Sequence, residues 1–161
     1  MIIPMAVTEQ RVLTPAQLAE RVRLLTATPA EWVARVRLDT EGRWYEQIGV
    51  DDSHEIWLIS WLPGHSTGFH DHGVSAGAFG VVWGELDEHL PSAGAPAPAR
   101  KVTSGVVRSF GPGYVHDVRN TSTSSVAVSV HAYSPPLSEM NRYELTAGGL
   151  VVRGTEGTED W

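Results

Sequence analysis

The spacing of apolar residues changes once, early in the chain, from a helical period to a strand period. Before the change, Leu18, Val22 and Leu25 recur at intervals of four and three residues, as on one face of an α-helix. Thr14 and Pro15 stand just ahead of this pattern. Threonine often caps the first turn of a helix, and proline is tolerated at its first position, so we predict that a helix begins here.

A second start signal, Thr28-Pro29, precedes another apolar stripe that contains Trp32 and Val36. We therefore expect a second helix and predict that the segment 1–40 is helical as a whole. Apolar stripes of this kind usually indicate packing, so these helices are expected to lie outside the remaining structure.

From Arg43 onward, short runs rich in Val, Ile, Trp and Tyr alternate with Gly, Pro, Asn and Ser clusters, which is typical of strands joined by turns. The predicted strands are Trp44–Val50, Ile56–Leu62, Gly77–Trp83, Glu85–Leu90, Val106–Phe110, Val115–Asn120, Val126–Tyr133 and Leu150–Arg153. Many short strands favour a sandwich or closed barrel, so we predict one domain, 1–161, with an all-β core at 43–153. Pro91–Pro98 is expected to be a loop, and the tail after Gly154 is expected to fray.

Composition and charge narrow the class of protein. A length of 161 residues fits one domain. The formal charge of −7 argues against nucleic acid and against an anionic membrane surface as partners. The chain has no cysteine, which excludes disulfides and thiolate ligands and fits a reducing cytoplasm. The opening Met1–Gln10 lacks the basic and apolar regions of a signal peptide. We expect a cytoplasmic protein that is a monomer or a weak homodimer and does not bind membranes.

Two histidines, His70 and His72, are separated by a single residue. Side chains two residues apart on a strand point the same way, so both imidazoles could reach one metal ion. Glycines on either side of the pair indicate tight turns. Imidazole is a good ligand for Fe, Zn, Ni and Cu alike, so the pair predicts a metal site without choosing the metal.

A third histidine, His116, follows the turn Gly111-Pro-Gly113, and the two histidine segments together resemble the two motifs of the cupin superfamily. The first motif is Gly, five residues, His-x-His, three or four residues, Glu, six residues, Gly. It is matched by Gly64, His70, His72, Gly77 and Gly84, with Gly77 in place of the Glu. The second motif is Gly, five residues, Pro-x-Gly, two residues, His, three residues, Asn. It is matched by Gly105, Gly111, Gly113, His116 and Asn120, with Gly111 in place of the Pro. The resemblance implies a cupin barrel, a double-stranded β-helix or jelly roll.

The glycine at position 77 changes the expected chemistry of the site, because many cupins place that Glu on the metal. Three neutral imidazoles leave the charge of a dication uncompensated and one face of the metal open. Such a site favours an anionic, chelating ligand.

Ser129, His131 and Tyr133 alternate along one predicted strand, so all three face the same side. His131 could hold the phenol of Tyr133, and Ser129 could fix the His131 tautomer. With the cupin motifs, this row and the Ser-Pro-Pro that ends it resemble the thiol dioxygenases of the cysteine dioxygenase family. The resemblance covers roughly Arg43 to Tyr143.

This resemblance implies that His70, His72 and His116 bind one Fe(II) per chain and that the substrates are a small thiol and O2. The thiolate would bind the iron, and both oxygen atoms would join the sulfur to give a sulfinate. The Ser-His-Tyr row would be catalytic, with Tyr133 forming a hydrogen bond to the substrate. Mammalian members join this Tyr to a Cys, whose place is taken here by Gly77, so Tyr133 must act unmodified.

Two further residues bear on the substrate. Cysteine-specific members bind the substrate carboxylate with an Arg two residues after a Tyr on an early strand, and here Gln47 follows Tyr45 at that position. Relatives acting on 3-mercaptopropionate resemble this Gln variant and carry an Arg nine residues after the strand Tyr, which matches Arg142. A guanidinium can grip a carboxylate through two parallel hydrogen bonds. Arg142, with Gln47 as a neutral partner, therefore favours 3-mercaptopropionate over cysteine.

Two other functions stay open. The chain could be a non-catalytic cupin that binds a metal or a small ligand as a sensor, although no DNA-binding segment accompanies the barrel. It could also be another cupin enzyme, such as an isomerase or a different dioxygenase, which the row from Ser129 to Tyr133 disfavours.

Overall fold

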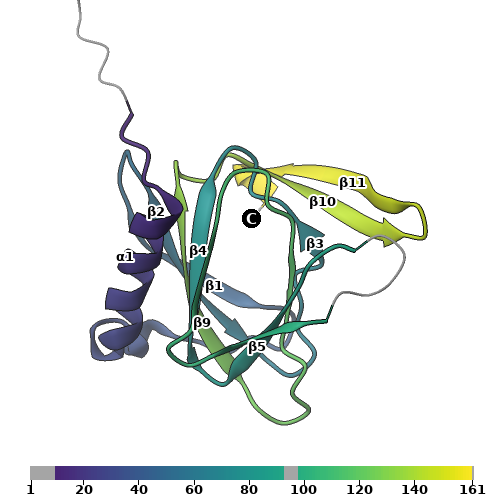
Figure 1. Ribbon diagram of the computed structural model, residues 1–161. Coiled ribbons are helices and arrows are strands. Elements are labelled where there is room, and N and C mark those ends of the chain that lie inside the picture. The colour runs from purple at the N-terminus through teal and green to yellow at the C-terminus, as the bar shows by residue number, and fades with distance from the viewer. Residues whose placement is uncertain (1–9, 93–97, 161) are drawn as a thin grey trace, which may run out of the picture.

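Helix α1 (Pro15–Ala27) begins at the predicted residue and packs against the largest sheet of the protein (Figure 1). The Thr14 hydroxyl accepts a hydrogen bond from the Gln17 N–H at 3.2 Å, and the Gln17 side chain accepts one from the Thr14 N–H at 2.9 Å. This reciprocal cap satisfies two of the N–H groups that every helix start leaves free. The predicted apolar stripe is buried through Leu18 and Val22, each stabilising the packed helix by roughly 1.5–3 kcal/mol.

The computed structural model describes residues 10–92 and 98–160. Residues 1–9, on which the expectation about a signal peptide rests, and residues 93–97 of the expected loop lie outside the described residues. Within the described ranges, no helix has the length and apolar character needed to cross a membrane.

The second α-helix expected after Thr28-Pro29 does not form, so the prediction of a helical segment 1–40 is wrong in this part. The segment makes two short 3-10 turns, η1 (Pro29–Glu31) and η2 (Val33–Arg35). The Trp32 side chain between them is buried, and its indole N–H donates to the Leu25 carbonyl at 2.9 Å. This anchor folds the segment back onto the end of α1, which explains why Trp32 is buried and Val33 and Val36 are partly buried without a second helix.

The described strands form three antiparallel sheets, as expected for an all-β core. They are β1 (Trp44–Val50), β2 (Glu55–Trp61), β3 (Phe69–His70), β4 (Ala76–Trp83), β5 (Glu85–His89), β6 (Arg100–Thr103), β7 (Val107–Phe110), β8 (Asp117–Arg119), β9 (Ala127–Ser134), β10 (Glu139–Thr146) and β11 (Gly149–Gly157). The strand orders are β1-β2-β9-β4-β7, β11-β10-β3 and β6-β5-β8. A short 3-10 turn, η3 (Thr158–Asp160), follows β11.

The tail after Gly154 is not frayed as expected. Strand β11 continues to Gly157, which pairs with Glu139 of β10. The sequence did not indicate β3, β6 or β10 as strands. The last of these has the mixed, largely polar sequence EMNRYELT and is only partly buried, so it carries no clear period of two.

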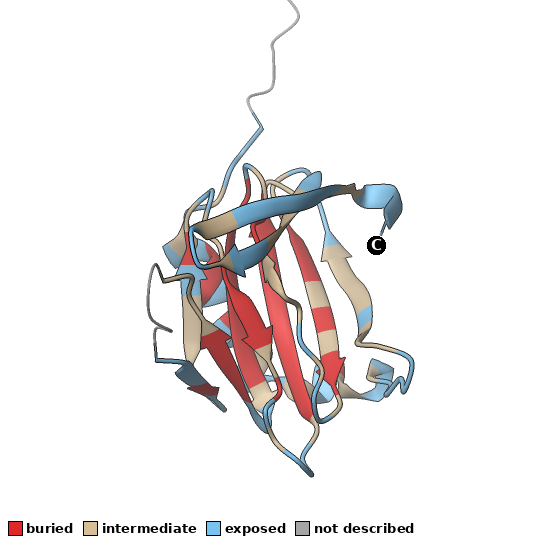
Figure 2. Ribbon diagram, turned by 90° about the vertical axis from the view of Figure 1, so that its right-hand side faces the viewer, coloured by how far each residue is buried: buried red, intermediate tan, exposed pale blue. Residues whose placement is uncertain are grey.

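Strand β9 separates the two parts of the core. Val128, Val130 and Ala132 lie in the apolar cluster that contains α1. Ser129, His131 and Tyr133 alternate with them and face the barrel interior. In Figure 2 the central strands are mostly buried, whereas the hairpin β10–β11 contains only partly buried and exposed residues. Inward-facing side chains of β9 are therefore shielded from solvent, whereas those of the hairpin lie close to it.

Candidate metal centre and pocket

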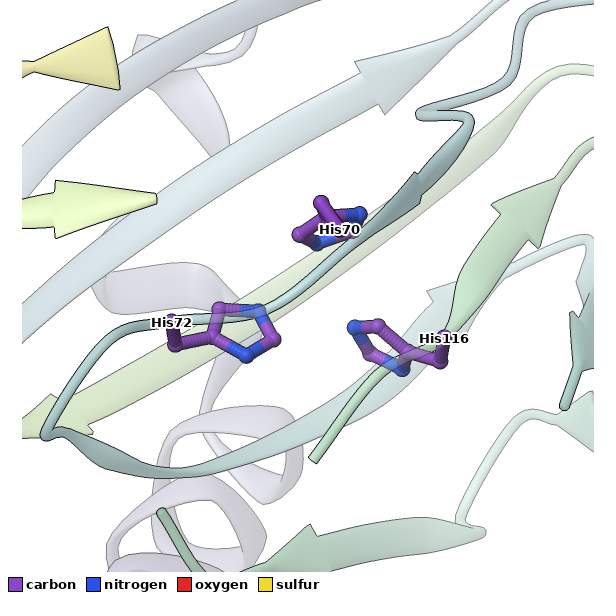
Figure 3. Close-up of side chains that lie close together, drawn as sticks. All are labelled: His70, His72 and His116. Atoms are coloured by element: carbon purple, nitrogen blue, oxygen red, sulfur yellow. The ribbon is translucent and has the colours of Figure 1, made fainter. Parts of the chain in front are cut away.

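The three predicted ligands converge inside the barrel (Figure 3). His70 ends β3, His72 follows in the next turn, and His116 immediately precedes β8. The backbones of His70 and His116 pair directly, each N–H donating to the other carbonyl at 3.0 and 3.1 Å. This bridge sets two ligands opposite each other, and the three ligand atoms all lie within 4.8 Å of one another.

The hydrogen bonds of the three rings leave nitrogen lone pairs free. Nδ1 of His70 lies 2.9 Å from the Gly68 carbonyl, and Nδ1 of His116 lies 2.9 Å from Oε2 of Glu88. Because both partners are acceptors, each Nδ1 carries the proton and each Nε2 is free. Neither ring nitrogen of buried His72 has a hydrogen-bond partner among the described residues. Burial lowers the pKa of His70 and of His72 well below the usual value, so both are neutral. Unpaired buried nitrogens on neutral rings fit a metal ion.

Glu88, which the sequence analysis missed, lies directly behind His116. It is fully buried on β5, and its other oxygen accepts from Arg100 at 2.9 Å. Tyr114 also donates to it at 3.1 Å. Burial would raise the pKa of Glu88, but the hydrogen bond from His116 and the charge of Arg100 lower it overall, so the carboxylate is ionised. A carboxylate behind a ligating histidine orients the ring and offsets part of a bound cation's charge. The sequence did contain one signal for Glu88: it lies two residues after apolar Leu86 on the same strand, so both side chains face the same side.

Phe110 fills the space beside Gly77, where the cupin motif would place a carboxylate. Gly77 lies opposite Phe110 on β7 and Tyr133 on β9. A Cβ atom at Gly77 would lie 2.5 Å from Cε2 of Phe110 and 3.0 Å from Cδ1 of Tyr133. The Phe110 ring stacks on His72, with centroids 4.8 Å apart. A side chain at position 77 is therefore excluded by an aromatic ring that packs on one ligand.

The predicted row on β9 is present. Oγ of Ser129 lies 2.8 Å from Nε2 of His131, and the Tyr133 hydroxyl lies 3.3 Å from Nδ1 of His131. The indole N–H of Trp61 donates to Ser129 at 2.8 Å. Because Ser129 accepts from Trp61, its own proton is available to Nε2, and we assign the His131 proton to Nδ1. The Tyr133 oxygen then accepts from His131, which leaves the phenolic proton free to donate into the pocket.

Both titratable members of this row are held neutral. Burial, followed by the charges of His116 and Arg43, lowers the pKa of His131 to about 3. Burial and nearby Glu55 raise the pKa of Tyr133 far above its ordinary value. The row can therefore donate a hydrogen bond at neutral pH without adding charge to the pocket.

A cavity of about 280 Å³ opens beside His116. It is lined by Arg43, Tyr45, Trp57, Ile59, Thr67, His116, His131, Tyr133, Leu137, Met140, Arg142, Glu156 and Asp160. Its size suits a small molecule, since sites for drug-sized ligands measure roughly 300–1,000 Å³.

The two predicted substrate residues differ in position. Arg142 lines the cavity, where it donates to the Thr67 carbonyl at 3.1 Å and to Glu156 at 3.0 Å. Gln47 does not line it, because its amide donates to buried Glu55 at 2.9 Å. The structure thus brings Arg142, but not Gln47, to the same pocket as Tyr133.

Asp71, between the two neighbouring histidines, connects this loop to β10. Its carboxylate accepts from the Asn141 backbone at 2.9 Å, the Asn141 side chain at 3.0 Å and the Tyr143 hydroxyl at 2.7 Å. Arg142 lies between these two partners in the chain. The metal loop and the hairpin wall of the pocket are therefore tied together by one buried carboxylate.

Antiparallel sheets with three buried histidines converging between them define a metal-binding cupin. A double-stranded β-helix protein of Klebsiella pneumoniae aligns with a TM-score of 0.55 over 64% of this chain and 85% of that chain, at 17% identity. A cupin superfamily protein of Desulfitobacterium hafniense gives a TM-score of 0.53 over 63% and 84%, at 10% identity. The predicted cupin fold is confirmed.

The chain belongs to the cysteine dioxygenase type I family, whose model matches residues 10–146. It is similar to cysteine dioxygenase type 1 of Danio rerio, with 27% identity over 138 residues, 76% of this chain and 66% of that protein. The Homo sapiens protein of the same name is also 27% identical, over 132 residues, 74% of this chain and 64% of that protein. The match thus spans just under two thirds of these relatives. The predicted family is confirmed.

Proposed function

We propose that the protein is a non-haem Fe(II) thiol dioxygenase that oxidises a small thiol carboxylate with O2 to the sulfinate. One observation carries this proposal. Three buried histidines meet beside a small cavity, which is also lined by Tyr133 and two arginines. Membership of the cysteine dioxygenase type I family supports it. A cytoplasmic location is part of the proposal, because a reducing compartment keeps small thiols reduced.

His70 and His116 would hold one Fe(II) through Nε2, and His72 would complete the ligand set. When bound, this iron would supply the open positions at which a thiolate and O2 meet, and the electrons that reduce O2 would come from the sulfur. Glu88 keeps the His116 ring in place from behind, and Asp71 fixes the loop that carries the other two ligands. Because burial lowers the pKa of His70 and of His72, these two ligands are neutral before metal arrives and need not lose a proton to bind it.

Tyr133 would act as a neutral hydrogen-bond donor to the substrate. Its oxygen is held by His131, which Ser129 and Trp61 fix in turn. Because its pKa is raised by burial, Tyr133 keeps its proton at neutral pH and can donate to a negatively charged sulfur or oxygen. No thioether to a cysteine is needed to position the ring, since its neighbours on β9 already do so.

The charges on the pocket wall favour 3-mercaptopropionate over cysteine. Arg43 and Arg142 both line the cavity, which suits the carboxylate that the two substrates share. Cysteine also carries an ammonium group, which would add a positive charge beside these arginines. Glu156, one of the two carboxylates on the wall, is already paired with Arg142. The substrate without the ammonium group therefore fits with less repulsion. Gln47 would act on this pocket only through Glu55.

The activity is tested by loading the purified protein with Fe(II) without O2 and then following O2 uptake with four thiols. We expect uptake with 3-mercaptopropionate, less with cysteine, and little with cysteamine or homocysteine, with a sulfinate detected by mass spectrometry. The control is His65→Ala, which removes a histidine outside the ligand set, compared with His72→Ala, which should lose both iron and uptake. Iron binding without uptake of O2 with any thiol would identify a non-catalytic metal-binding cupin. A product other than a sulfinate would identify another cupin-type dioxygenase.

A further inference from the structure

His72 is held in place differently from the other two histidines in Figure 3. The ring of His70 is fixed by the Gly68 carbonyl, and the ring of His116 is fixed by Glu88. Neither nitrogen of the His72 ring has a hydrogen-bond partner among the described residues, although the side chain is almost fully buried. The last side-chain torsion of histidine has broad energy wells, so a ring without such a partner can turn about it. Another contact must therefore set the plane of this ligand.

Two aromatic rings stack on His72. The centroid of the Phe110 ring lies 4.8 Å from that of His72 with 27° between the planes, and the Tyr133 centroid lies 5.0 Å away at 25°. Tyr114 stacks on Phe110 in turn, with centroids 4.7 Å apart and planes 9° apart. Tyr114, Phe110, His72 and Tyr133 thus form one continuous aromatic stack that includes a metal ligand.

Both ends of this aromatic stack are anchored. Tyr133 lies on β9, in which every residue is buried. At the other end, the Tyr114 hydroxyl donates to Glu88 at 3.1 Å and accepts from Arg100 at 2.8 Å. Phe110, between Tyr114 and the ligand, is itself buried. The stack can therefore hold an imidazole plane, because the rings on either side of it in the series are fixed by other contacts.

We propose that Phe110 is the residue that positions His72 as a metal ligand, through stacking and in place of a hydrogen bond. This inference rests on the proposed function and deepens it, because it names the contact that orients the third ligand. Stacked aromatic pairs attract each other beyond the area that they bury, and a stacked face leaves both ring nitrogens free. Gly77 is required by the same arrangement, since a side chain there would displace the Phe110 ring.

The test measures metal binding without turnover. Fe(II) affinity is measured without O2 by competition with a chelator, and the Co(II)-loaded protein gives paramagnetically shifted proton NMR signals from the ligand imidazoles. We expect Phe110→Leu to weaken Fe(II) binding about 10- to 100-fold, the typical loss when a partner that orients a ligating histidine is removed. The N–H signal of His72 should broaden through exchange with water. The N–H signals of His70 and His116 should stay sharp, because acceptors hold these protons.

Two variants of Tyr114 separate the ring from its hydroxyl. Tyr114→Phe keeps the outer ring of the stack and loses only the hydrogen bonds to Glu88 and Arg100, whereas Tyr114→Leu loses the ring as well. We expect Fe(II) to bind more weakly to Tyr114→Leu than to Tyr114→Phe, and the His72 signal to broaden only in the leucine variant. Because Tyr114 is only partly buried, this pair of variants decides the question if Phe110→Leu does not fold.

Leu58→Ala is the control for a general loss of stability. Leu58 is fully buried in the apolar cluster that contains α1, on the far side of β9 from the metal centre. Its truncation should lower the free energy of unfolding at least as much as Phe110→Leu, because it leaves a cavity in the core. The Fe(II) affinity and the shifted signals should stay as in the parent protein, since no ring of the aromatic stack is changed.

The outcomes separate the two proposals. A parent protein that binds neither Fe(II) nor Co(II) contradicts the proposed function and this inference together. A parent that binds metal but oxidises no thiol contradicts the proposed function alone, and weaker metal binding in Phe110→Leu and Tyr114→Leu then still supports the inference. Unchanged affinity and unchanged signals in these two variants, or an equal loss of affinity in Leu58→Ala, would overturn this inference alone.

Discussion

The strand β9 and the hairpin β10–β11 both contribute to the pocket, but they are stabilised by different forces. Every residue of β9 is buried, and its inward row is fixed by hydrogen bonds from Trp61 through Ser129 to Tyr133. No residue of the hairpin is buried, and its pocket residues Arg142 and Glu156 form an ion pair. Partly exposed ion pairs contribute about 0–1 kcal/mol, whereas burying one large side chain contributes roughly 1.5–3 kcal/mol. The residues that we propose as hydrogen-bond donors to the substrate thus lie on β9, the rigid wall, and the hairpin is the wall that can be altered with the smallest loss of stability.

The largest effect is expected from Tyr133→Phe, which removes one hydroxyl from the rigid wall. We expect kcat for O2 uptake to fall about 100-fold, the typical loss when one preorganised donor is removed. Iron content should stay the same, because Tyr133 is not in the ligand set. Loss of iron in this variant would show that Tyr133 supports the metal centre rather than the substrate.

Glu88→Gln should weaken Fe(II) binding about 10- to 100-fold, since it removes the charge behind His116 but keeps the shape of the side chain. Competition with a metal chelator measures this affinity without any turnover. The matched control is Glu85→Gln on the same strand, where the carboxylate is exposed and pairs with Lys101. Equal Fe(II) affinities in the two variants would show that Glu88 does not support the metal centre.

Gly77→Ala tests how tightly the rigid wall is packed. The added methyl group would overlap Phe110, so we expect the free energy of unfolding to fall by about 1–3 kcal/mol in urea titrations. Adding Phe110→Leu should recover part of this loss, because it removes the ring atoms that clash. The control is Gly154→Ala, where no atom lies within 4 Å of the new methyl group. An unchanged free energy of unfolding in Gly77→Ala would show that this wall accommodates an added methyl group as readily as the hairpin does.

The smallest effect is expected from Glu156→Gln on the hairpin. The free energy of unfolding should change by less than about 1 kcal/mol, because a partly exposed pair contributes little. The KM for an anionic thiol should fall a few-fold, since Arg142 is then no longer neutralised. Glu144→Gln, which breaks the other hairpin pair away from the cavity, serves as the control. A raised KM would contradict the view that Glu156 competes with the substrate for Arg142.

The parts of the fold that the sequence predicted best are those with a strong local period. The bounds of β1 follow from a run rich in Trp, Tyr, Ile and Val, and the inward row of β9 follows from alternation, since side chains two residues apart face the same side. The three ligands were predictable because their spacing repeats two known motifs. Strands β3 and β6 are too short to show a period, and β10 is too polar.

Residues that act at a distance along the chain were not predictable from local pattern. Glu88 reaches His116 only because β5 pairs with β8 in one particular register. Arg43 and Gln47 lie an even number of positions apart, so the sequence alone does not distinguish their positions relative to the pocket. The hydrogen bond that holds Gln47 on Glu55 depends on how β1 pairs with β2. The tail was misjudged for the same reason, because its order comes from β10 rather than from its own sequence.

The direct backbone pairing of His70 with His116 has a consequence for how the protein meets its metal. In small zinc domains the ion organises the chain, so removing it unfolds the domain. Here two of the three ligands are set opposite each other by hydrogen bonds from backbone N–H groups to carbonyls, inside a core that is closed by α1 and by apolar residues. We therefore expect folding and metal loading to be separate events, so that a bound metal ion can leave and return while the barrel stays intact.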